Sequence, residues 1–471
     1  MRKLLKKHLL LISVLPLIAN FLLNTFSGNV SYLQYLYENK VLLLAVLVNS
    51  LFYFQVSKQI NLALQLRSIS LSLVYFLTSF YIFNLTFMPI FKKSSFKTTL
   101  IVVLFIWLCF LAYKAEKKFE IIKIPIFLIA SNLLNSKYYS KLSSLYGYKE
   151  LNTDVPLQWN KLAELISSEN LYYAFTNNII EGQTLSISYI QSLLFNLNFY
   201  SYDFTFVRLN SNLMIIFVLF FIYDTNLSKQ DKIVSSIALI SFILNSDWLT
   251  YLFFDSLMLE GLVSLIFSIL VLNIKNHINI KPNLLSFFYF LSFSFLLFTK
   301  QFVSTIALLT LAYLLIRFKN KNVFVGFVLY FLHKLYNFIY VPASDGFELL
   351  QGTSLRELLF DILTFDNLAF YNVNKVIQQL SLDKPFLYFL LIFMLYNLKR
   401  FLQKLSDSDS ALLDMIFLIV IINFVLVFLL YIVWWKDFGI QSSYRYILNL
   451  LLTMYYSLLI NINLFKKKIK P

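Results

Sequence analysis

Cysteine, histidine and charged residues are scarce in this sequence of 471 residues. The single cysteine, Cys109, excludes an intrachain disulfide and a cysteine-based metal site. The three histidines are far apart, at His8, His277 and His333, and show no spacing typical of metal ligands. Charged residues make up 14% of the chain and hydrophobic residues 59%. So few charges could not cover the apolar surface of a soluble protein of this length, and the soluble class is therefore excluded.

Long apolar segments recur along the whole chain. A helix crosses the hydrocarbon of a bilayer with about 20 residues. The sequence therefore predicts an all-α, polytopic helical membrane protein with about fourteen spans, the first of which is an uncleaved helix after a basic start. The predicted spans are residues 8–26, 41–56, 68–91, 98–113, 121–135, 206–223, 233–252, 255–274, 284–299, 302–316, 323–341, 386–398, 411–433 and 446–463.

Basic residues give the chain a formal net charge of +16. They mostly flank the apolar segments, which fits anchoring on the cytoplasmic side better than binding to nucleic acid. The positive-inside rule then places both termini in the cytoplasm, and we expect a bacterial inner membrane. The main exceptions are Lys92, Lys93 and Lys97, which this orientation places outside.

The same orientation places two long segments on the exoplasmic face, residues 136–205 and about 342–385. Within the first of them, "TLSISYIQSLLFNLNFY" (184–200) is apolar enough to suggest a further span. A crossing there would reverse every later loop and place the basic clusters outside. We therefore expect a juxtamembrane or partly inserted helix near the outer interface.

The acidic stretch "NTDVPLQWNKLAELI" in the first exoplasmic segment resembles the first large loop of GT-C-type integral membrane glycosyltransferases. Asp154 stands in the place of the catalytic acid, and Trp159 and Lys161 resemble residues that often follow it. The resemblance covers about residues 121–463, so that 121–471 is the expected GT-C-like core and 1–120 an N-terminal addition. Other matching positions, in segments similar to later parts of the family pattern, are Arg208, Asp255, Lys300 and Arg445.

The resemblance implies transfer of a sugar from a polyprenyl-phosphate donor to an acceptor that the sequence does not define. A carboxylate such as Asp154 can take the proton from an acceptor hydroxyl. Positive charge from Arg445, Lys300, Arg208 or Lys161 would stabilise the phosphate leaving group. Trp159 could stack on the sugar or anchor the chain at the interface, and Asp255 would belong to the substrate site. No cofactor is assigned, and a divalent metal is left open.

Structural roles compete with these chemical roles. Asp154 could cap a helix over residues 157–168, since Asp is favoured at that position. Lys161 and Glu164 could form a surface ion pair on the same helix. Arg208, at the start of a span, could mark the level of the lipid headgroups.

Three other functions are compatible with a chain of this kind. A transporter or flippase of lipid-linked saccharides should have helices broken by Gly or Pro near the middle of the membrane, but the chain has only eight of each. An O-antigen polymerase or ligase would favour arginine-rich outer loops, whereas residues 342–385 contain only Arg356. In a structural membrane protein without chemistry, Asp154 would tolerate replacement by Asn.

Overall fold

A computed structural model of the chain is entirely helical in the part that it describes, with no strand among those residues. That part leaves out several connecting segments and, in some helices, the side chains. It comprises residues 2–26, 40–114, 118–145, 160–176, 188–190, 192–193, 197, 204–245, 260–278, 284–298, 301–319, 321–340, 374, 378, 384–402, 410–429 and 449–468.

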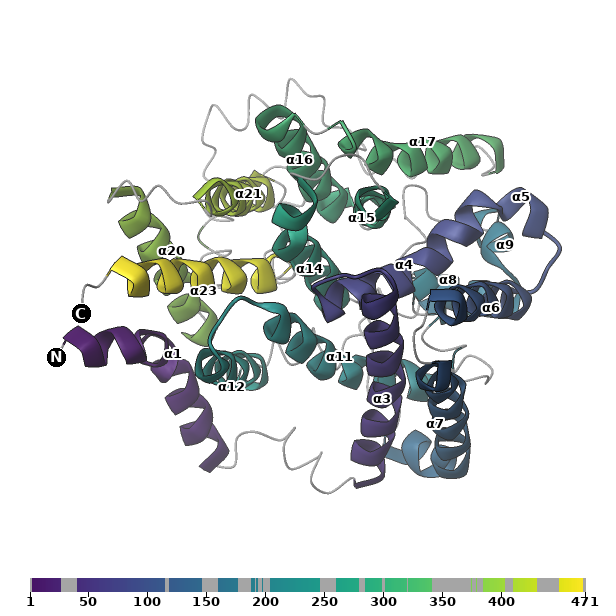
Figure 1. Cartoon of the computed structure of the whole chain (residues 1–471), viewed down its shortest axis with the longest axis horizontal. Coiled ribbons are helices and arrows are strands. Elements are labelled where there is room, and N and C mark those ends of the chain that lie inside the picture. Colours follow the sequence, from purple (N-terminus) through teal and green to yellow (C-terminus); the bar gives the residue numbers. More distant parts are fainter. Residues whose placement is uncertain are drawn as a thin grey trace. The chain divides into compact units, whose positions relative to one another are not determined.

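The chain divides into two compact units, each made of segments that are distant in the sequence (Figure 1). Unit 1 contains Met1–Val30, Asn226–Thr250 and Gly346–Pro471, and unit 2 contains Ser31–Thr225 and Tyr251–Asp345. Each unit is described by itself below.

Unit 1 brings the first and last helices of the chain together. Helix α1 packs against α12, and α20 and α21 pack against α23. Aromatic rings join three of these helices, because Phe389 lies 5.0 Å from Phe242 and 6.2 Å from Tyr455, measured between ring centroids. The helices are α1 (Arg2–Phe26), α12 (Lys229–Asn245), α20 (Lys384–Leu402), α21 (Ser410–Leu429) and α23 (Leu451–Lys468).

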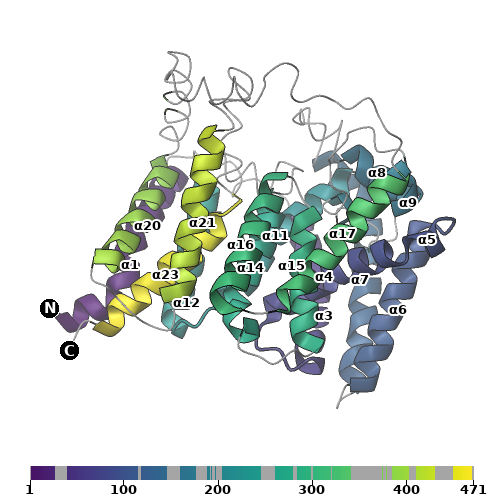
Figure 2. The same ribbon diagram turned by 90° about the horizontal axis from the view of Figure 1, so that it is seen from above.

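Unit 2 holds the other helices, and Figure 2 shows α14, α15, α16 and α17 side by side within it. Its first helices are α3 (Lys40–Ala63), α4 (Ile69–Thr86), α5 (Met88–Phe91), α6 (Phe96–Lys114) and α7 (Lys118–Leu145). They are followed by α8 (Asn160–Ser168), α9 (Leu171–Thr176), α11 (Phe204–Asp224) and α14 (Glu260–Ile278). The last are α15 (Leu284–Phe295), the 3₁₀ helix η3 (Leu296–Phe298), α16 (Gln301–Phe318) and α17 (Val323–Tyr340).

Helix α4 is the central helix of unit 2. It contacts α3, α6, α11, α14, α15 and α17, and 72% of its residues are buried. Helices α6 and α7 lie at the periphery of the unit. Only 28% of the residues in the apolar stretch of α6, and 22% of those in α7, are buried. Side chains such as Phe105 of α6 and Leu133 of α7 are about two-thirds exposed. These outward apolar faces are what lipid would cover in a membrane.

Each of the fourteen predicted spans overlaps a helix of the structure. Among the described residues, five helices are long and apolar enough to cross a membrane, which supports the prediction of a helical membrane protein at this coarser level. These five are Ile69–Thr86, Phe96–Lys114, Phe119–Lys137, Lys384–Leu402 and Ser410–Val427. Shorter apolar helices account for several of the other predicted segments.

Some predicted boundaries were wrong. The segment 68–91 is two helices, because α4 ends at Thr86 and Pro89, which has no N–H to donate, lies in the separate helix α5. Residues 284–299 likewise change from α-helix to 3₁₀ helix at Leu296. Helix α7 continues to Leu145, well past the predicted end at residue 135.

Candidate functional site

The residues predicted from the sequence to form a site fall largely where the structure gives no description. Asp154, Trp159, Asp255, Lys300 and Arg445 lie outside the described residues. Two more predicted residues have a described backbone only: Lys161, in the first turn of α8, and Arg208, near the start of α11. That these side chains come together is therefore still a prediction. The structure does show the directions of the helices that carry or follow them.

Asp224, the last residue of α11, binds the first turn of α4. Its Oδ2 accepts hydrogen bonds from Ser70 N at 2.7 Å, Ser70 Oγ at 2.5 Å and Ser68 Oγ at 2.9 Å. Its Oδ1 accepts a hydrogen bond from Ile69 N at 3.1 Å. Ser68 Oγ also accepts a hydrogen bond from Asn273 Nδ2 of α14, at 3.2 Å. The contacts therefore gather the start of α4 and the C-terminal parts of α11 and α14 at one end of unit 2, called the Asp224 end below.

The Asp224 carboxylate serves as a cap for α4 supplied by another helix. Free N–H groups at the start of a helix need an acceptor, and an acidic group is the most favourable one there. Burial raises the pKa of the Asp224 carboxyl above its usual value, and the hydrogen bonds from Ser70, Ile69 and Ser68 oppose this shift. With four donors around it, this carboxylate is a structural element. The sequence did not single it out, although serine before an apolar run is a known start signal for helices.

The other helices of unit 2 are oriented by similar contacts. Asn322, just before α17, donates through Nδ2 to Ser286 Oγ near the start of α15, at 3.0 Å. Ser292, further along α15, shares a hydrogen bond of 3.1 Å with Thr78 of α4. The Tyr75 hydroxyl of α4 also donates to Leu285 O at the start of α15, at 3.5 Å, so the two contacts follow the same order along both helices. Helices α15 and α4 therefore run in the same direction, away from the Asp224 end, and α16, which follows α15 and η3 directly, runs back towards it.

These directions place several helix starts at the opposite end of unit 2. Helices α11 and α14 reach the Asp224 end with their C-termini, so they start at the other end, as α16 does. Helix α8 also lies at that other end, because it contacts α6 and because Glu169, the residue after α8, accepts a hydrogen bond from Phe96 N at the start of α6. This end, called the α8 end, thus contains helix α8, which carries Lys161, and the start of α11, which carries Arg208. It also contains the starts of α14 and α16, which follow Asp255 and Lys300 in the sequence.

The junction between α8 and α9 is tied to the loop that precedes α6. Asn170 donates through Nδ2 to Lys92 O at 3.0 Å and to Ser94 O at 3.1 Å. Asn170 Oδ1 accepts a hydrogen bond from Tyr173 N at 2.8 Å, which caps α9. Phe96 N donates to Glu169 O at 2.8 Å. Segments that the orientation rule had independently placed outside, residues 92–97 and part of 136–205, therefore lie together.

The described part of the segment 184–200 packs onto this end of unit 2. Ser192 Oγ donates to Ala163 O of α8, and Asn84 of α4 donates to the hydroxyl of Tyr189. Tyr189 itself donates to Phe80 O at 3.1 Å and is fully buried. These contacts hold the described part of this segment against α4 and α8, and its position relative to a membrane stays a prediction.

Polar contacts within the apolar region were missed by the sequence analysis. Between α3 and α7, Ser131 Oγ donates to Asn49 Oδ1 at 2.6 Å, and Asn49 Nδ2 donates to Asn135 Oδ1 at 3.4 Å. All three side chains are buried. They join two helices through amides and a hydroxyl, a common way of holding helices together in lipid. The visible signal was Asn within otherwise apolar segments.

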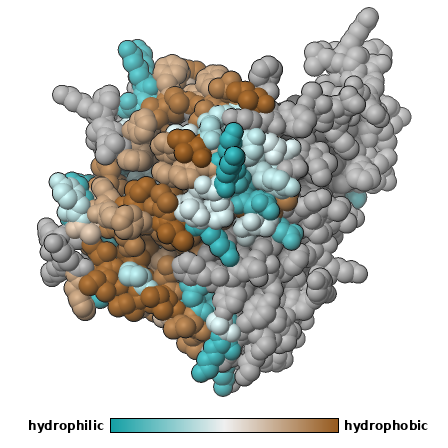
Figure 3. Space-filling model, turned by 90° about the vertical axis from the view of Figure 1, so that its right-hand side faces the viewer, coloured by the Kyte–Doolittle hydropathy of each residue, from teal (hydrophilic) through white to brown (hydrophobic). Residues whose placement is uncertain are grey.

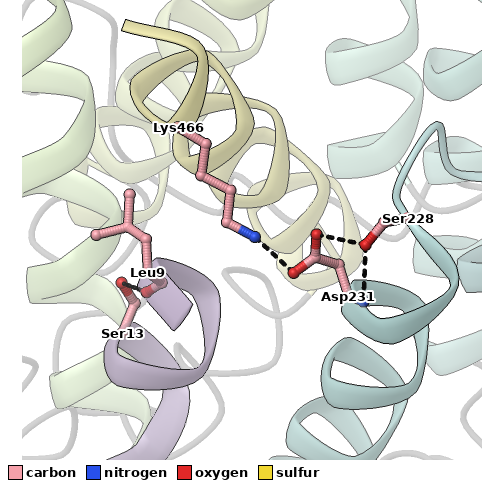
Figure 4. A network of polar contacts seen from close by, with 5 residues as sticks. All are labelled: Leu9, Ser13, Ser228, Asp231 and Lys466. Carbon is pink, nitrogen blue, oxygen red and sulfur yellow. Dashed lines mark hydrogen bonds and ion pairs between the residues drawn. The ribbon is translucent and has the colours of Figure 1, made fainter. Parts of the chain in front are cut away.

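Unit 1 has charged contacts at the ends of its helices. Lys466 Nζ of α23 lies 2.5 Å from Asp231 Oδ1 of α12, and Ser228 Oγ donates to Asp231 Oδ2 at 2.8 Å (Figure 4). The Arg400 side chain is 6% exposed, and its Nη1 lies 2.6 Å from Asp414 Oδ1. The first pair joins α12 to α23, and the second joins α20 to α21.

The part of the chain that the structure describes contains no candidate metal site. Among the residues it describes, no group of three or more His, Cys, Asp or Glu side chains could hold a metal ion. The divalent metal left open above thus stays a hypothesis about residues outside this part of the chain.

Comparison of the chain with family models, with curated proteins and with solved structures found no match.

Proposed function

We propose that this protein is an integral membrane glycosyltransferase that transfers a sugar from a polyprenyl-phosphate donor to an acceptor on the exoplasmic face. The observation that supports the proposal is the direction of the helices in unit 2. Helix α8 and the starts of α11, α14 and α16 share the α8 end, and each carries or follows a residue that the GT-C resemblance assigns to the site.

The finer membrane arrangement belongs to the same proposal. It has fourteen spans, both termini in the cytoplasm of a bacterium, and the α8 end on the exoplasmic side of the inner membrane. Residues 121–471 form the GT-C-like core and residues 1–120 precede it. The contacts support this arrangement by bringing together, within each unit, loops that it assigns to the same side.

In the proposed reaction Asp154 takes the proton of an acceptor hydroxyl. The acceptor oxygen then bonds to the anomeric carbon as the bond from that carbon to the phosphate oxygen breaks. The polyprenyl phosphate leaves with the electron pair, and Lys300, Arg445, Arg208 and Lys161 would stabilise its charge. Trp159 would stack on the sugar, and Asp255 would orient the substrate.

The direct test is sugar transfer in vitro by the purified full chain and by Asp154→Asn. Removing a general base should lower the rate by about 10²–10⁴-fold. Glu164→Gln is the matched control, because Glu164 is an exposed carboxylate on α8, and it should leave the rate unchanged. Equal transfer by the wild type and Asp154→Asn would contradict the proposed base. Equal losses in Asp154→Asn and the control would indicate a general effect of charge.

A labelling experiment tests the orientation independently. With Cys109 replaced by Ser, a cysteine placed at Ser168 of the α8 end should react with a membrane-impermeant maleimide added to intact cells. A cysteine placed at Lys319, which is exposed near the Asp224 end, should react only after permeabilisation. The reverse pattern would place the α8 end in the cytoplasm and exclude exoplasmic transfer.

A further inference from the structure

Three lysines in one short loop are the main exceptions to the positive-inside orientation predicted from the sequence. Lys92, Lys93 and Lys97 lie in or next to the loop between α5 and α6, and all three are exposed. None forms an ion pair with any residue that the structure describes. Loops on the outer side normally contain few lysines, so three of them in one loop are an exception in the predicted orientation.

The position of this loop relative to a bilayer follows from its neighbours. Helices α4 (Ile69–Thr86) and α6 (Phe96–Lys114) are both long and apolar enough to cross a membrane. The residues between them must then lie at the membrane surface, at the level of the headgroups. This placement requires only that α4 and α6 cross the membrane, and it does not depend on the proposed sugar transfer.

Apolar side chains accompany the lysines. Ile90 of α5 is 72% exposed and Phe87 is 39% exposed. The Phe83 ring lies 4.8 Å from that of Phe87 and 5.8 Å from that of Phe91, so aromatic rings line the same turn. Figure 3 views the chain from the side on which α5 and α6 lie, and hydrophilic side chains there border a broad hydrophobic surface. Exposed apolar groups beside lysines are typical of a surface that enters the headgroup region.

The backbone of the loop is held in place by the protein. Asn170 donates to the carbonyl oxygens of Lys92 and Ser94, and Phe96 N donates to Glu169 O. The N-terminus of α6 already has its own acceptor, since Thr98 N donates to Ser95 Oγ at 3.3 Å. The positive charges of the three lysines are therefore attached to a loop whose backbone is held in place by these hydrogen bonds.

We propose that Lys92, Lys93 and Lys97, together with the exposed Ile90 and Phe87, form a binding surface for anionic phospholipid headgroups of the surrounding bilayer. Lysine ammonium groups bind phosphate as point charges, and the apolar side chains of α5 lie between the upper parts of the acyl chains. Asn170 links this loop to the junction of α8 and α9. The bound lipid therefore also fixes the position of that junction along the membrane normal.

The test measures lipid selectivity with the purified full chain in bilayers of phosphatidylcholine. Spin-labelled phosphatidylglycerol and spin-labelled phosphatidylcholine are compared for association with the protein. A lysine close to an anionic surface changes association by a factor of about five. The triple variant Lys92→Gln, Lys93→Gln, Lys97→Gln should therefore lose at least about fivefold of the preference for phosphatidylglycerol, and the triple Arg variant should retain it.

The matched control is the triple variant Lys114→Gln, Lys319→Gln, Lys321→Gln. It also removes three exposed lysines from unit 2, but from the opposite end, where Ile90 and Phe87 do not accompany them, and it should lose less of the preference. Unchanged thermal unfolding midpoints check that both triple variants are folded. An equal loss in both variants, or no loss in the first, would overturn the proposal. Competition by glycerol 1-phosphate as effective as that by lipid would also overturn it, since the surface would then bind a soluble anion.

Discussion

The side-chain amide of Asn170 donates to the backbone carbonyl oxygen of Lys92 at 3.0 Å and so joins two loops that lie 78 residues apart in the sequence. The same side chain also donates to Ser94 O and caps α9 through Tyr173 N. One amide thus fixes the lysine loop to the segment that follows the predicted catalytic loop.

Replacing Asn170 should release this loop. Asn170→Ala loses all three hydrogen bonds, whereas Asn170→Asp keeps the acceptor for Tyr173 N and loses both donors. We expect faster hydrogen exchange of the backbone amides in residues 92–98 in both variants, and faster exchange at Tyr173 only in Asn170→Ala. Ser168→Ala is the control, because Ser168 Oγ bonds only within its own helix. Unchanged exchange over residues 92–98 in Asn170→Ala would show that the link does not hold the loop.

Asp224 is expected to stabilise unit 2 by capping α4. Asp224→Asn can keep the three hydrogen bonds to one oxygen if its carbonyl takes the place of Oδ2, but it loses the bond from Ile69 N. Asp224→Ala loses all four. The free energy of unfolding should fall by about 1 kcal/mol for Asn and by about 2–3 kcal/mol for Ala, since each bond to a charged group contributes about 1.5–3 kcal/mol and the losses are not additive. Thermal unfolding in detergent measures whether Asp224→Ala is less stable than Asp224→Asn. Equal stability of Asp224→Ala and the wild type would refute the capping role of Asp224.

The contribution of Asp224 should also depend on pH. Asp224 lies just beyond the predicted span 206–223, and burial raises the pKa of its carboxyl from the ordinary value of 3.8. A folded-state pKa above the unfolded value means that protonation favours the folded protein. This stabilisation is complete below the ordinary pKa and is lost as the pH rises through the folded pKa. The difference in unfolding midpoint between the wild type and Asp224→Asn should therefore be larger in acid and decrease towards neutral pH. A difference that grows with pH would show that the hydrogen bonds outweigh burial.

The pair between Asp231 and Lys466 should stabilise unit 1. Their side chains are 20% and 13% exposed, and the atoms are 2.5 Å apart. Because removing one partner leaves the other charge partly buried, Asp231→Asn or Lys466→Gln should lower the free energy of unfolding by about 1.5–3 kcal/mol. The double variant should cost less than the sum of the two single variants. Lys229→Gln, at an exposed lysine on the same helix as Asp231, should change stability little. Strictly additive losses would show that the two charges are not coupled.

Gly326 allows α17 to approach α15 and α16 closely. A Cβ at this position would lie 3.2 Å from Leu311 Cδ1 and 3.5 Å from Phe290 O. For Gly326→Ala, the gain in helix propensity of about 1 kcal/mol should roughly offset the small shift of Leu311. Gly326→Val adds two further methyl groups and should destabilise the protein by about 1–3 kcal/mol. Val328→Ile, on an exposed part of α17, is the control. A thermal midpoint of Gly326→Val equal to that of the wild type would disprove the tight contact.

Much of the helical arrangement follows from local properties of the chain. Apolar segments of about 20 residues must form helices in lipid because their backbone groups find no other partners there. For this reason each predicted span overlaps a helix. The ends were less predictable, as at Thr86 and Leu145, because capping and tertiary contacts set them. No pattern in the sequence indicated that α7 would continue past residue 135.

The sequence by itself determined the helical class and the positions of the apolar segments, since these depend on hydropathy along the chain. Only the tertiary structure decided the contacts between segments far apart, such as Asp224 with the start of α4, Asn170 with Lys92, and Asp231 with Lys466. A side chain within an apolar segment has many possible partners. Which one it meets depends on how the helices pack, and packing depends on the whole chain at once.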